Sequence, residues 1–378
     1  MFALISAAAL TLTPIACLVP PAEIETWDVT SGRTDADEYG YAVCATADGG
    51  CVVAGEVYGD IDDRSGIYLA RFDAKGTELW TQEYDGEWEQ VAQSVAQTAN
   101  GGFVVAGCSS GYMYLLKTDG AGTSEWSRTY GGPEENWGYS VRQTVGGGYV
   151  IAGASYWDPM WGKDAYLVRT DASGKRLWQR VYGGRGDDEA RGVVQTDDGG
   201  FALLGTTWEP DQAEGDFLLV RTDASGDTLW TRTYGDADYE IGTGIIETRD
   251  HGFALCGLTC SFGAGRWDGW LVRTDSLGDT LWTQTFGGRG DDGVTSVCEA
   301  PDRGLVVCGY YEDEVDYVML AKTDERGDTL WSRIVSLGEG VGYSVALARD
   351  GGFIAAGYVE TDTGLDVLVL KRDADGRR

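Results

Sequence analysis

The chain has 378 residues, of which 43% are hydrophobic, so it can bury a sizeable core, and its 57 glycines against seven prolines indicate many tight turns. Its 61 acidic and 29 basic residues give a formal net charge of −32. A surface this acidic repels phosphate backbones and anionic lipid headgroups, which excludes nucleic acid and the membrane surface as partners.

Residues 1–22 form the first distinct segment. They are apolar and carry no charge, and the run is too short for a membrane span. An apolar run followed by small residues resembles a signal peptide, so we expect an exported protein, whether secreted, periplasmic or on the cell surface. Cys17, directly after Ala16, also suggests a lipoprotein-type leader with a lipid anchor on that cysteine. We expect no transmembrane span in the mature chain.

A repeat of 46–53 residues follows this segment. A tryptophan ends a recurring sequence motif at seven places: Trp27, Trp80, Trp126, Trp178, Trp230, Trp282 and Trp331. A fixed period in this range indicates an array of supersecondary units, because one unit alone cannot bury its own faces. Residues 23–378 are therefore expected to form a single domain, despite their length.

One copy, residues 191–235, predicts four strands. Residues 191–196 and 201–207 flank the turn Asp-Asp-Gly-Gly, whose glycines suit the positive φ of a tight hairpin. Residues 216–222 are an almost continuous apolar run, so both faces of this third strand must be covered. Residues 227–234 follow another tight turn. Four short antiparallel strands with covered faces favour a β-propeller, in which neighbouring sheets stack around an axis.

The number of hairpins sets the number of blades. Seven fifteen-residue copies of the first hairpin occur, at 41–55, 93–107, 139–153, 191–205, 243–257, 295–309 and 343–357. The last copy has no closing tryptophan strand, and the strand around Trp27 has no sheet of its own. We therefore predict an all-β, seven-bladed propeller of four-stranded antiparallel blades, whose last blade is closed by the N-terminal strand.

The recurring motif is Asp-x-x-Gly-x-x-x-Trp, complete in six copies from Asp73–Trp80 to Asp324–Trp331. Its Asp can bond the turn backbone and its Gly can adopt a left-handed conformation. The tryptophan can bury its ring against a neighbouring blade. The seven tryptophans are therefore interpreted as structural docking residues, one for each blade.

This motif resembles the tryptophan-docking motif of quinoprotein-type (PQQ-like) β-propeller repeats, with one residue fewer between Asp and Gly in every copy. The resemblance covers essentially residues 25–376. The chain is also similar to propeller repeats of secreted bacterial and archaeal proteins that have no assigned chemistry. The family's dehydrogenases carry a cofactor site that typically includes adjacent cysteines or a metal-bound Asp. No adjacent cysteine pair occurs here, so we predict no quinone cofactor.

Acidic residues recur in the connections between blades. One aligned position holds Asp37, Glu89, Glu135, Asp187, Tyr239, Asp291 and Glu339. The next position holds Glu38, Gln90, Asn136, Asp188, Glu240, Asp292 and Gly340. Such carboxylates either accept hydrogen bonds from loop N–H groups or form a cation-binding or substrate-facing ring at the mouth of the central channel. Asp187, Asp188, Asp291 and Asp292 are the candidate metal ligands, and Ca²⁺ is the ion that oxygen ligands would suit.

The loops between the second and third strands carry aromatic residues beside carboxylates. The candidates for ligand binding are Trp157, Trp161, Trp208, Trp267 and Tyr311, which do not recur in every blade. Aromatic faces with hydrogen-bond acceptors suit sugars or peptides. The alternative is that these side chains cover the blade ends and pack together.

Catalytic motifs are scarce, and no catalytic residue is predicted. His251 is the only histidine and occupies a turn position, which excludes histidine-based triads. The sequence therefore favours an exported, non-enzymatic and monomeric propeller that binds an extracellular carbohydrate or protein through its acidic, aromatic loop face. Two alternatives stay open: a propeller-type enzyme, carbohydrate-active or quinone-dependent, and a purely structural cell-surface module.

Overall fold

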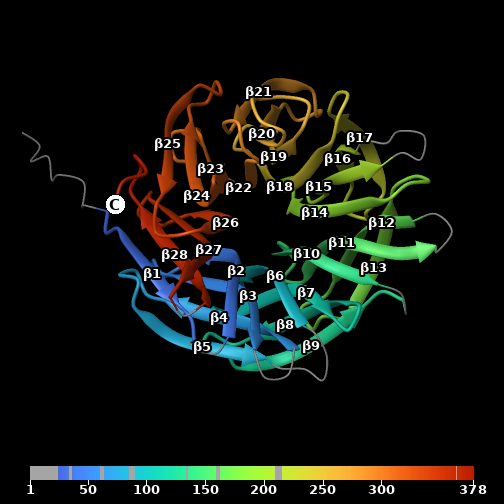
Figure 1. The fold of residues 1–378 in the computed structure, drawn as a ribbon. Coiled ribbons are helices and arrows are strands. Elements are labelled where there is room, and N and C mark those ends of the chain that lie inside the picture. The colour runs from blue at the N-terminus through green and yellow to red at the C-terminus, as the bar shows by residue number, and fades with distance from the viewer. Residues whose placement is uncertain are drawn as a thin grey trace, which may run out of the picture.

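The computed structural model describes residues 24–33, 36–59, 64–84, 90–132, 135–158, 162–208, 215–362 and 364–378, without the side chains of residues 64, 157 and 158. Its 28 strands form seven four-stranded antiparallel sheets. The sheets stand like blades around a central axis (Figure 1). The predicted fold class is therefore confirmed. Within the described ranges, no helix has the length and hydropathy needed to span a bilayer.

Each blade takes its strands in chain order, from the axis outward. Blades 1 and 2 contain β2 (Ala36–Ala45), β3 (Cys51–Gly59), β4 (Arg64–Phe72) and β5 (Glu78–Tyr84), then β6 (Gln90–Gln97), β7 (Phe103–Ser109), β8 (Tyr112–Thr118) and β9 (Ser124–Tyr130). Blades 3 and 4 contain β10 (Asn136–Gln143), β11 (Tyr149–Asp158), β12 (Gly162–Thr170) and β13 (Arg176–Tyr182), then β14 (Asp188–Gln195), β15 (Phe201–Trp208), β16 (Gly215–Thr222) and β17 (Thr228–Tyr234).

The remaining blades repeat this order until the last strand. Blades 5 and 6 contain β18 (Glu240–Glu247), β19 (Phe253–Thr259), β20 (Asp268–Thr274) and β21 (Thr280–Phe286), then β22 (Gly293–Glu299), β23 (Leu305–Asp313), β24 (Val315–Thr323) and β25 (Thr329–Val335). Blade 7 contains β26 (Gly340–Leu347), β27 (Phe353–Thr361), β28 (Gly364–Arg372) and β1 (Trp27–Ser31).

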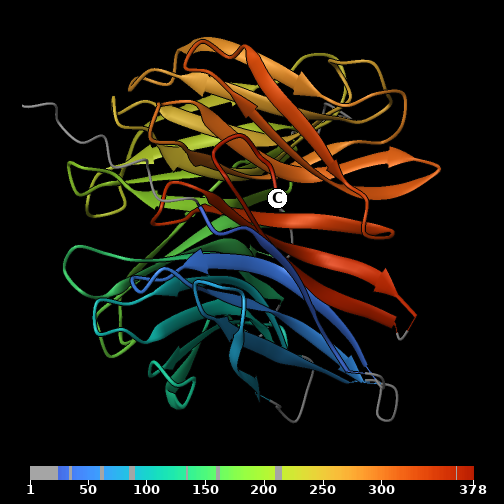
Figure 2. The ribbon, with the colours of Figure 1, turned by 90° about the vertical axis from the view of Figure 1, so that its left-hand side faces the viewer.

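The N-terminal strand closes the ring, as predicted. β1 pairs antiparallel with β28, and the register runs from Trp27 opposite Lys371 to Ser31 opposite Val367. Figures 1 and 2 both show β1 (blue) beside β28 (red), although the two strands lie at opposite ends of the sequence. A buried ion pair between Asp28 and Arg372 joins the same two segments. The last blade therefore has no unpaired outer edge on β28.

The hydrophobic core lies between the blades. Buried side chains form seven clusters, and each cluster joins two adjacent blades, including blade 7 with blade 1. The middle strands of each blade supply most of these residues, because both of their faces are covered. β16 and β20, for example, are buried along almost their entire length. This agrees with the continuous apolar runs that the sequence shows there.

Each docking tryptophan lies against the turn of the next blade. In every case the ring is within 3 Å of the position that a Cβ on that turn's glycine would take: Trp27 at Gly76, Trp80 at Gly122, Trp126 at Gly174, Trp178 at Gly226, Trp230 at Gly278, Trp282 at Gly327 and Trp331 at Gly376. All seven glycines have positive φ. Each copy of the motif therefore makes two contacts between blades. Its tryptophan packs against the turn glycine of the next blade, and its own glycine packs against the tryptophan of the preceding blade.

The opposite ends of the blades carry different connections. The turns between first and second strands, and between third and fourth, lie at one end, which we call the turn face. They are short and similar in every blade. The loops between second and third strands and the connections between blades lie at the other end, which we call the loop face.

Candidate functional site

The innermost strands of the seven blades line a channel along the axis. Each of these strands has a β-bulge near its middle, where two residues face one partner or one residue is left unpaired. A bulge redirects a side chain. The bulged residues all line the central cavity: Tyr41, Gln93, Tyr139, Arg191, Thr243, Thr295 and Tyr343. The fold thus presents one variable side chain per blade to a common space.

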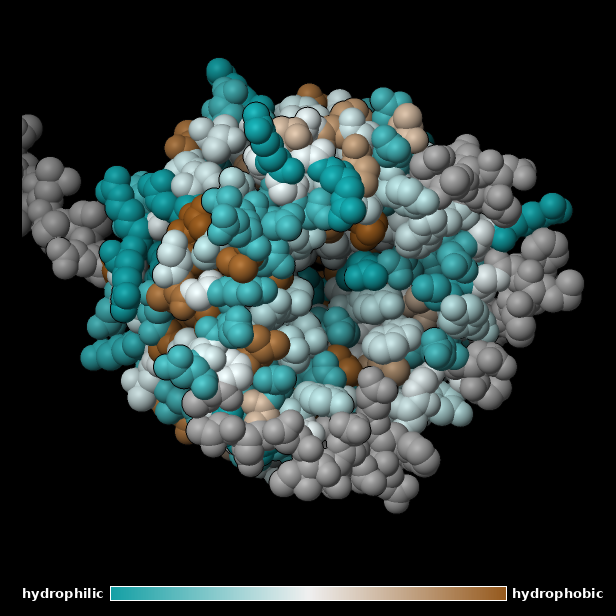
Figure 3. Space-filling view, in the orientation of Figure 1, coloured by the Kyte–Doolittle hydropathy of each residue, from teal (hydrophilic) through white to brown (hydrophobic). Residues whose placement is uncertain are grey.

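The channel forms a cavity with a volume of about 760 Å³. Figure 3 shows its opening as a hollow at the centre of one face. The volume lies within the range of about 300–1,000 Å³ that is typical of small-molecule sites. Among the described residues, its lining includes tyrosine, serine, threonine and arginine side chains, but no Asp or Glu. A chain with a net charge of −32 therefore encloses a channel whose lining charges are cationic.

Four tyrosines cluster on the side of the channel formed by blades 7 and 1. Tyr41 and Tyr343 line the cavity with their ring centroids 5.1 Å apart. Tyr39 stacks on Tyr41 at 5.7 Å, and Tyr358 packs edge-on against Tyr39 at 5.3 Å. All four rings are half-buried. Closure of the ring by the N-terminal strand creates this cluster, because its members come from both ends of the chain.

The channel tyrosines are neutral hydrogen-bonding groups at ordinary pH. The Tyr41 hydroxyl donates to Oε2 of Glu56 at 3.2 Å. Burial, reinforced by the Glu56 carboxylate, raises the pKa of Tyr41 well above its usual range. Burial and the neighbouring Tyr358 likewise raise the pKa of Tyr343. The cluster therefore offers apolar ring faces together with phenol groups that stay protonated.

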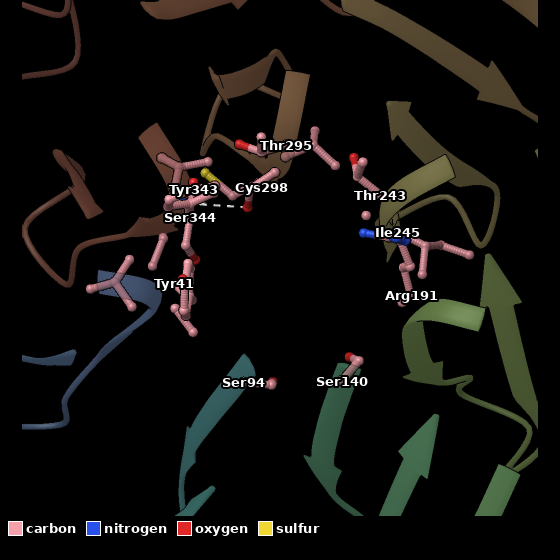
Figure 4. Close-up of a pocket in the computed structure, with 18 of the residues that line it drawn as sticks. Tyr41, Ser94, Ser140, Arg191, Thr243, Ile245, Thr295, Cys298, Tyr343 and Ser344 are labelled. Atoms are coloured by element: carbon pink, nitrogen blue, oxygen red, sulfur yellow. Dashed lines mark hydrogen bonds between the residues drawn. The ribbon is translucent and has the colours of Figure 1, made fainter. Parts of the chain in front are cut away.

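The opposite side of the channel, formed by blades 3 and 4, is cationic. Figure 4 shows Arg191 across the open centre from Tyr41 and Tyr343. Nε of Arg191 donates to Oε1 of Glu189 at 2.6 Å, and its guanidinium lies 5.1 Å from the centroid of the Tyr139 ring. These contacts hold Arg191 in place while its side chain stays 41% exposed to the channel.

Arg142 is the second arginine that lines the channel. It is half-buried, and its Nη1 donates to the carbonyl oxygen of Val141 at 2.8 Å. Among the described residues no carboxylate lies within 4.0 Å of its guanidinium nitrogens. Burial lowers the pKa of Arg142 below its ordinary value.

Serine hydroxyls lie between the two sides of the channel. The Oγ atoms of Ser94 and Ser140 accept the backbone N–H of Val141 at 3.1 Å and of Val193 at 3.3 Å. Each bond ties one innermost strand to the next. Because these oxygens act as acceptors in that bond, each hydroxyl keeps its own proton for donation toward the cavity.

The predicted ligand-binding aromatics lie on the loop face, on separate blades. Trp208 ends β15 of blade 4, Trp267 lies 6.4 Å from Tyr239 near blade 5, and Tyr311 packs against the cluster between blades 5 and 6. Among the described residues no ring contact joins these three side chains. The side chain of Trp157 and all of Trp161 lie outside the described residues. Ligand binding by these five residues stays a prediction.

Two of the candidate metal ligands, Asp187 and Asp188, accept hydrogen bonds from loop backbone. Oδ1 of Asp187 accepts the N–H of Lys163 at 2.8 Å, which joins blade 4 to the loop of blade 3. Asp188 is buried, and its Oδ2 accepts the N–H of Gly184 at 2.8 Å. These contacts are the ones that a loop-bonding role requires.

The other two candidates have similar partners. Asp291 forms an ion pair with Arg266. Asp292 is fully buried and accepts the N–H groups of Gly288 at 2.6 Å and Glu312 at 2.9 Å. In the described part of the chain, no group of three or more His, Cys, Asp or Glu residues is arranged to hold a metal ion. Calcium binding stays a prediction.

Several buried acids occur in pairs where two blades meet. The carboxylates of Asp216 and Glu240 both point to the space beside Gly235, and those of Asp268 and Asp292 both point to the space beside Gly287. Asp366 and Glu38 meet in the same way beside Gly32, where blade 7 joins blade 1. At two of these junctions burial raises the pKa of one acid, namely Asp292 beside Asp268 and Glu38 beside Asp366.

In the sequence, the two acidic residues of a junction are either both present or both absent. Asp164 and Asp188 occupy the same two positions at a fourth junction. At the three remaining junctions both acids are replaced together, by Gly66 with Gln90, Tyr112 with Asn136, and Tyr317 with Gly340. No junction keeps one acid of the pair without the other, so the two positions change together.

Glu38 is expected to make the stability of the protein depend on pH. Burial, more than the nearby Asp366 carboxylate, raises the pKa of Glu38 from 4.5 to about 7. The protonated form is therefore favoured in the folded state, so this stabilisation is complete below pH 4.5 and is lost as pH rises through 7. Glu38→Gln, which stays neutral, should unfold like the native protein at pH 4.5 but be about 1–3 kcal/mol more stable at pH 8.

Urea unfolding of both proteins at the two pH values measures this difference. Glu25→Gln removes the same charge at an exposed position and serves as the control. An equal effect of Glu38→Gln at pH 4.5 and pH 8 would contradict the protonated state of Glu38.

Comparison with known proteins supports the fold. No protein-family model matches the chain, and no curated protein matches it. The WD40 domain of Neurospora crassa Pan2 is similar in structure, with a TM-score of 0.58 and 10% sequence identity over 92% of this chain and 96% of that domain. A protein of unknown function from Dyadobacter fermentans DSM 18053 gives a TM-score of 0.49 and 12% identity, over 91% of this chain and 97% of that one. At this identity the first likeness shows a shared propeller fold alone.

Proposed function

We propose that the chain is an exported, non-enzymatic propeller that binds a carbohydrate in its central channel. The tyrosine cluster on blades 7 and 1 is the observation that carries the proposal. Tyr41 and Tyr343 offer half-exposed ring faces beside protonated hydroxyls. Sugar rings present apolar C–H faces and hydroxyl groups, so such a surface can satisfy both by stacking and hydrogen bonding.

The composition of the channel lining supports binding rather than catalysis. Hydrolysis of a glycosidic bond ordinarily uses two carboxyl groups that flank that bond. Among the described residues that line the cavity there is no Asp or Glu. Serine and threonine hydroxyls line it instead, and they can exchange hydrogen bonds with a polyhydroxyl ligand. The loop aromatics Trp208 and Trp267 would add contacts for a ligand that extends out of the channel.

Export is the part of the proposal that rests on residues 1–22. Their apolar run resembles a signal peptide, so the mature chain should begin between about residues 17 and 25. Mass spectrometry of the protein from its native host measures this directly, and an intact Met1 would contradict it. Modification of a new N-terminal Cys17 by lipid would add a membrane anchor.

Replacing the channel tyrosines should weaken binding without unfolding the protein. A glycan array, run with and without Ca²⁺, would first identify a ligand. Tyr41→Ala and Tyr343→Ala should then each weaken its binding about tenfold, because each removes one stacking face. Isothermal titration calorimetry measures the change, and Tyr112→Ala, which removes an exposed tyrosine of blade 2, is the matched control.

Two results would contradict this placement of the site. Unchanged affinity in both channel variants would remove the tyrosine cluster from the site. Loss of binding in Trp208→Ala or Trp267→Ala, with the channel variants unaffected, would place the ligand on the loop face instead.

A further inference from the structure

The channel lining contains a cation for which the described chain supplies no anion. Arg142 is half-buried and donates to a carbonyl of its own strand, but no described carboxylate pairs with it. An enclosed guanidinium without a counter-ion is costly, because desolvation is not offset by an ion pair. In a protein that is strongly acidic overall, this arrangement calls for a separate explanation.

Most other buried cations of the described chain have a carboxylate partner. The third strand of each blade carries an Arg or Lys that reaches toward the turn face. Arg71, Arg221 and Lys371, for example, each lie 2.5 Å from a turn carboxylate, namely Asp48, Asp198 and Asp350. In six of the seven blades this cation pairs with a carboxylate. The exception among the described residues is Arg169 of blade 3, which donates to the carbonyl oxygens of Tyr149 and Thr170. Arg142 has no such partner.

The fold does not require a cation at the position of Arg142. The equivalent residues of the other six blades are small or apolar: Cys44, Ala96, Val194, Ile246, Cys298 and Ala346. Packing between innermost strands is thus satisfied by an uncharged side chain at every other blade. The arginine is specific to blade 3, and its side chain lines the channel.

Other groups with donor protons face the same cavity. Arg191 of the neighbouring blade bonds Glu189 through Nε, and its side chain is 41% exposed. The hydroxyls of Ser94 and Ser140 accept backbone N–H groups and keep a proton to donate. Guanidinium forks and hydroxyl donors together are the groups that recognise an oxyanion.

We infer that the channel binds an anionic oligosaccharide, whose carboxylate or sulfate group is held by Arg142 and Arg191 while a sugar ring rests on Tyr41 and Tyr343. This inference rests on the proposed carbohydrate function and specifies the ligand class. An oligosaccharide is expected because Arg191 stands across the open centre from Tyr41 and Tyr343 (Figure 4). The absence of acidic side chains among the described lining residues fits a ligand that is itself negatively charged.

Inorganic sulfate tests the anion site without any sugar. The variant is Arg142→Ala, which introduces the residue found at this position in blades 2 and 7. Sodium sulfate, compared with sodium chloride at equal ionic strength, should raise the melting temperature of the native protein more than that of the variant. General stabilisation by sulfate acts on both proteins equally, so the variant removes it from the comparison. Arg326→Ala, which removes an exposed turn arginine, should respond like the native protein.

An equal response of the native protein and Arg142→Ala to sulfate would overturn the inference. So would a large loss of stability of that variant in chloride alone, because the arginine would then serve the fold. Arg142→Gln, which keeps much of the side-chain length, repeats the comparison should the alanine variant fail to fold.

Oligosaccharides test the ligand class. Trigalacturonate and its fully methyl-esterified form differ only in charge at the carboxyl groups. The native protein should bind the acid at least tenfold more tightly than the ester, and Arg142→Ala should lose that preference. On the glycan array, comparing the binding of carboxylated glycans with that of sulfated glycans would show which oxyanion group the channel prefers.

The two proposals can fail separately. Binding of neutral glycans that depends on Tyr41, together with an identical sulfate response in Arg142→Ala, would refute the anion site and leave carbohydrate binding standing. A sulfate response that depends on Arg142, with no glycan bound by the array, would refute carbohydrate binding and leave the anion site. Equal affinity for the acid and its ester would refute the anionic ligand class.

Discussion

Deletion of residues 1–31, which removes β1, is expected to unfold the propeller under conditions where the intact chain is folded. The deletion breaks the ladder between β1 and β28 and removes Trp27, whose ring is only 8% exposed. It also leaves buried Arg372 without Asp28. These losses add to a cost on the order of 5 kcal/mol or more, comparable with the whole stability of many domains.

Thermal melting and size-exclusion chromatography would measure this effect. The exposed edge of β28 should also promote aggregation, because its N–H and C=O groups lose their partners. Deletion of residues 1–23, which keeps β1, is the control and should leave the melting temperature unchanged. Equal melting of the two truncated proteins would contradict closure of the ring by the N-terminal strand.

Trp230→Ala is expected to cost about 3 kcal/mol, the lower end of the range for a large aromatic residue because the ring is half-buried. The Trp230 ring packs edge-on against Phe253 at 6.2 Å and lies against the turn glycine Gly278 of the next blade. The guanidinium of Arg232 lies 5.5 Å from the ring centroid on blade 4. All three contacts are lost with the side chain.

Two further variants separate docking from general surface effects. Gly278→Ala should also destabilise the protein, because its φ is +82° and a methyl group would lie 2.9 Å from the Trp230 ring. Leu229→Ala, at the exposed neighbouring position, should change the free energy of unfolding by less than about 0.5 kcal/mol. Urea denaturation measures all three. A cost of Trp230→Ala no larger than that of Leu229→Ala would contradict the docking role.

Much of this fold could be predicted from the sequence because the same pattern of strands and turns occurs in seven copies. In residues 191–235 the predicted strands agree with β14 to β17 to within three residues at each end. The unmatched strand at Trp27 and the incomplete last copy together predicted the closure of blade 7. Hydrophobic runs and turn residues are local signals, so repetition made them unambiguous.

The acidic positions between the blades were predicted only in part. Their recurrence indicated either backbone bonding or cation binding, and the contacts of Asp188 and Asp292 are of the first kind. The proximity of Glu240 to Asp216 could not be predicted from either repeat copy alone, because the two residues lie on different blades. A comparison of third-strand and first-strand positions across the repeats would have found the joint replacement.

The channel site was missed by sequence reasoning for a different reason. Its residues sit at β-bulges, which have no reliable sequence signal, and the side chain presented there differs from blade to blade. Tyr41 and Tyr343 are 302 residues apart and meet only because the ring closes. The signal that could have found Arg142 is present in the seven aligned hairpins, where it is the only charged residue at its position.

A crystal structure of the protein with the best-binding oligosaccharide from the array would test the proposed function most directly. The account predicts electron density for the ligand inside the central channel, with a sugar ring on Tyr41 and Tyr343 and an oxyanion group beside Arg142 and Arg191. Density for the ligand outside the channel, for example on Trp208 or Trp267 of the loop face, with the channel occupied only by water, would contradict it.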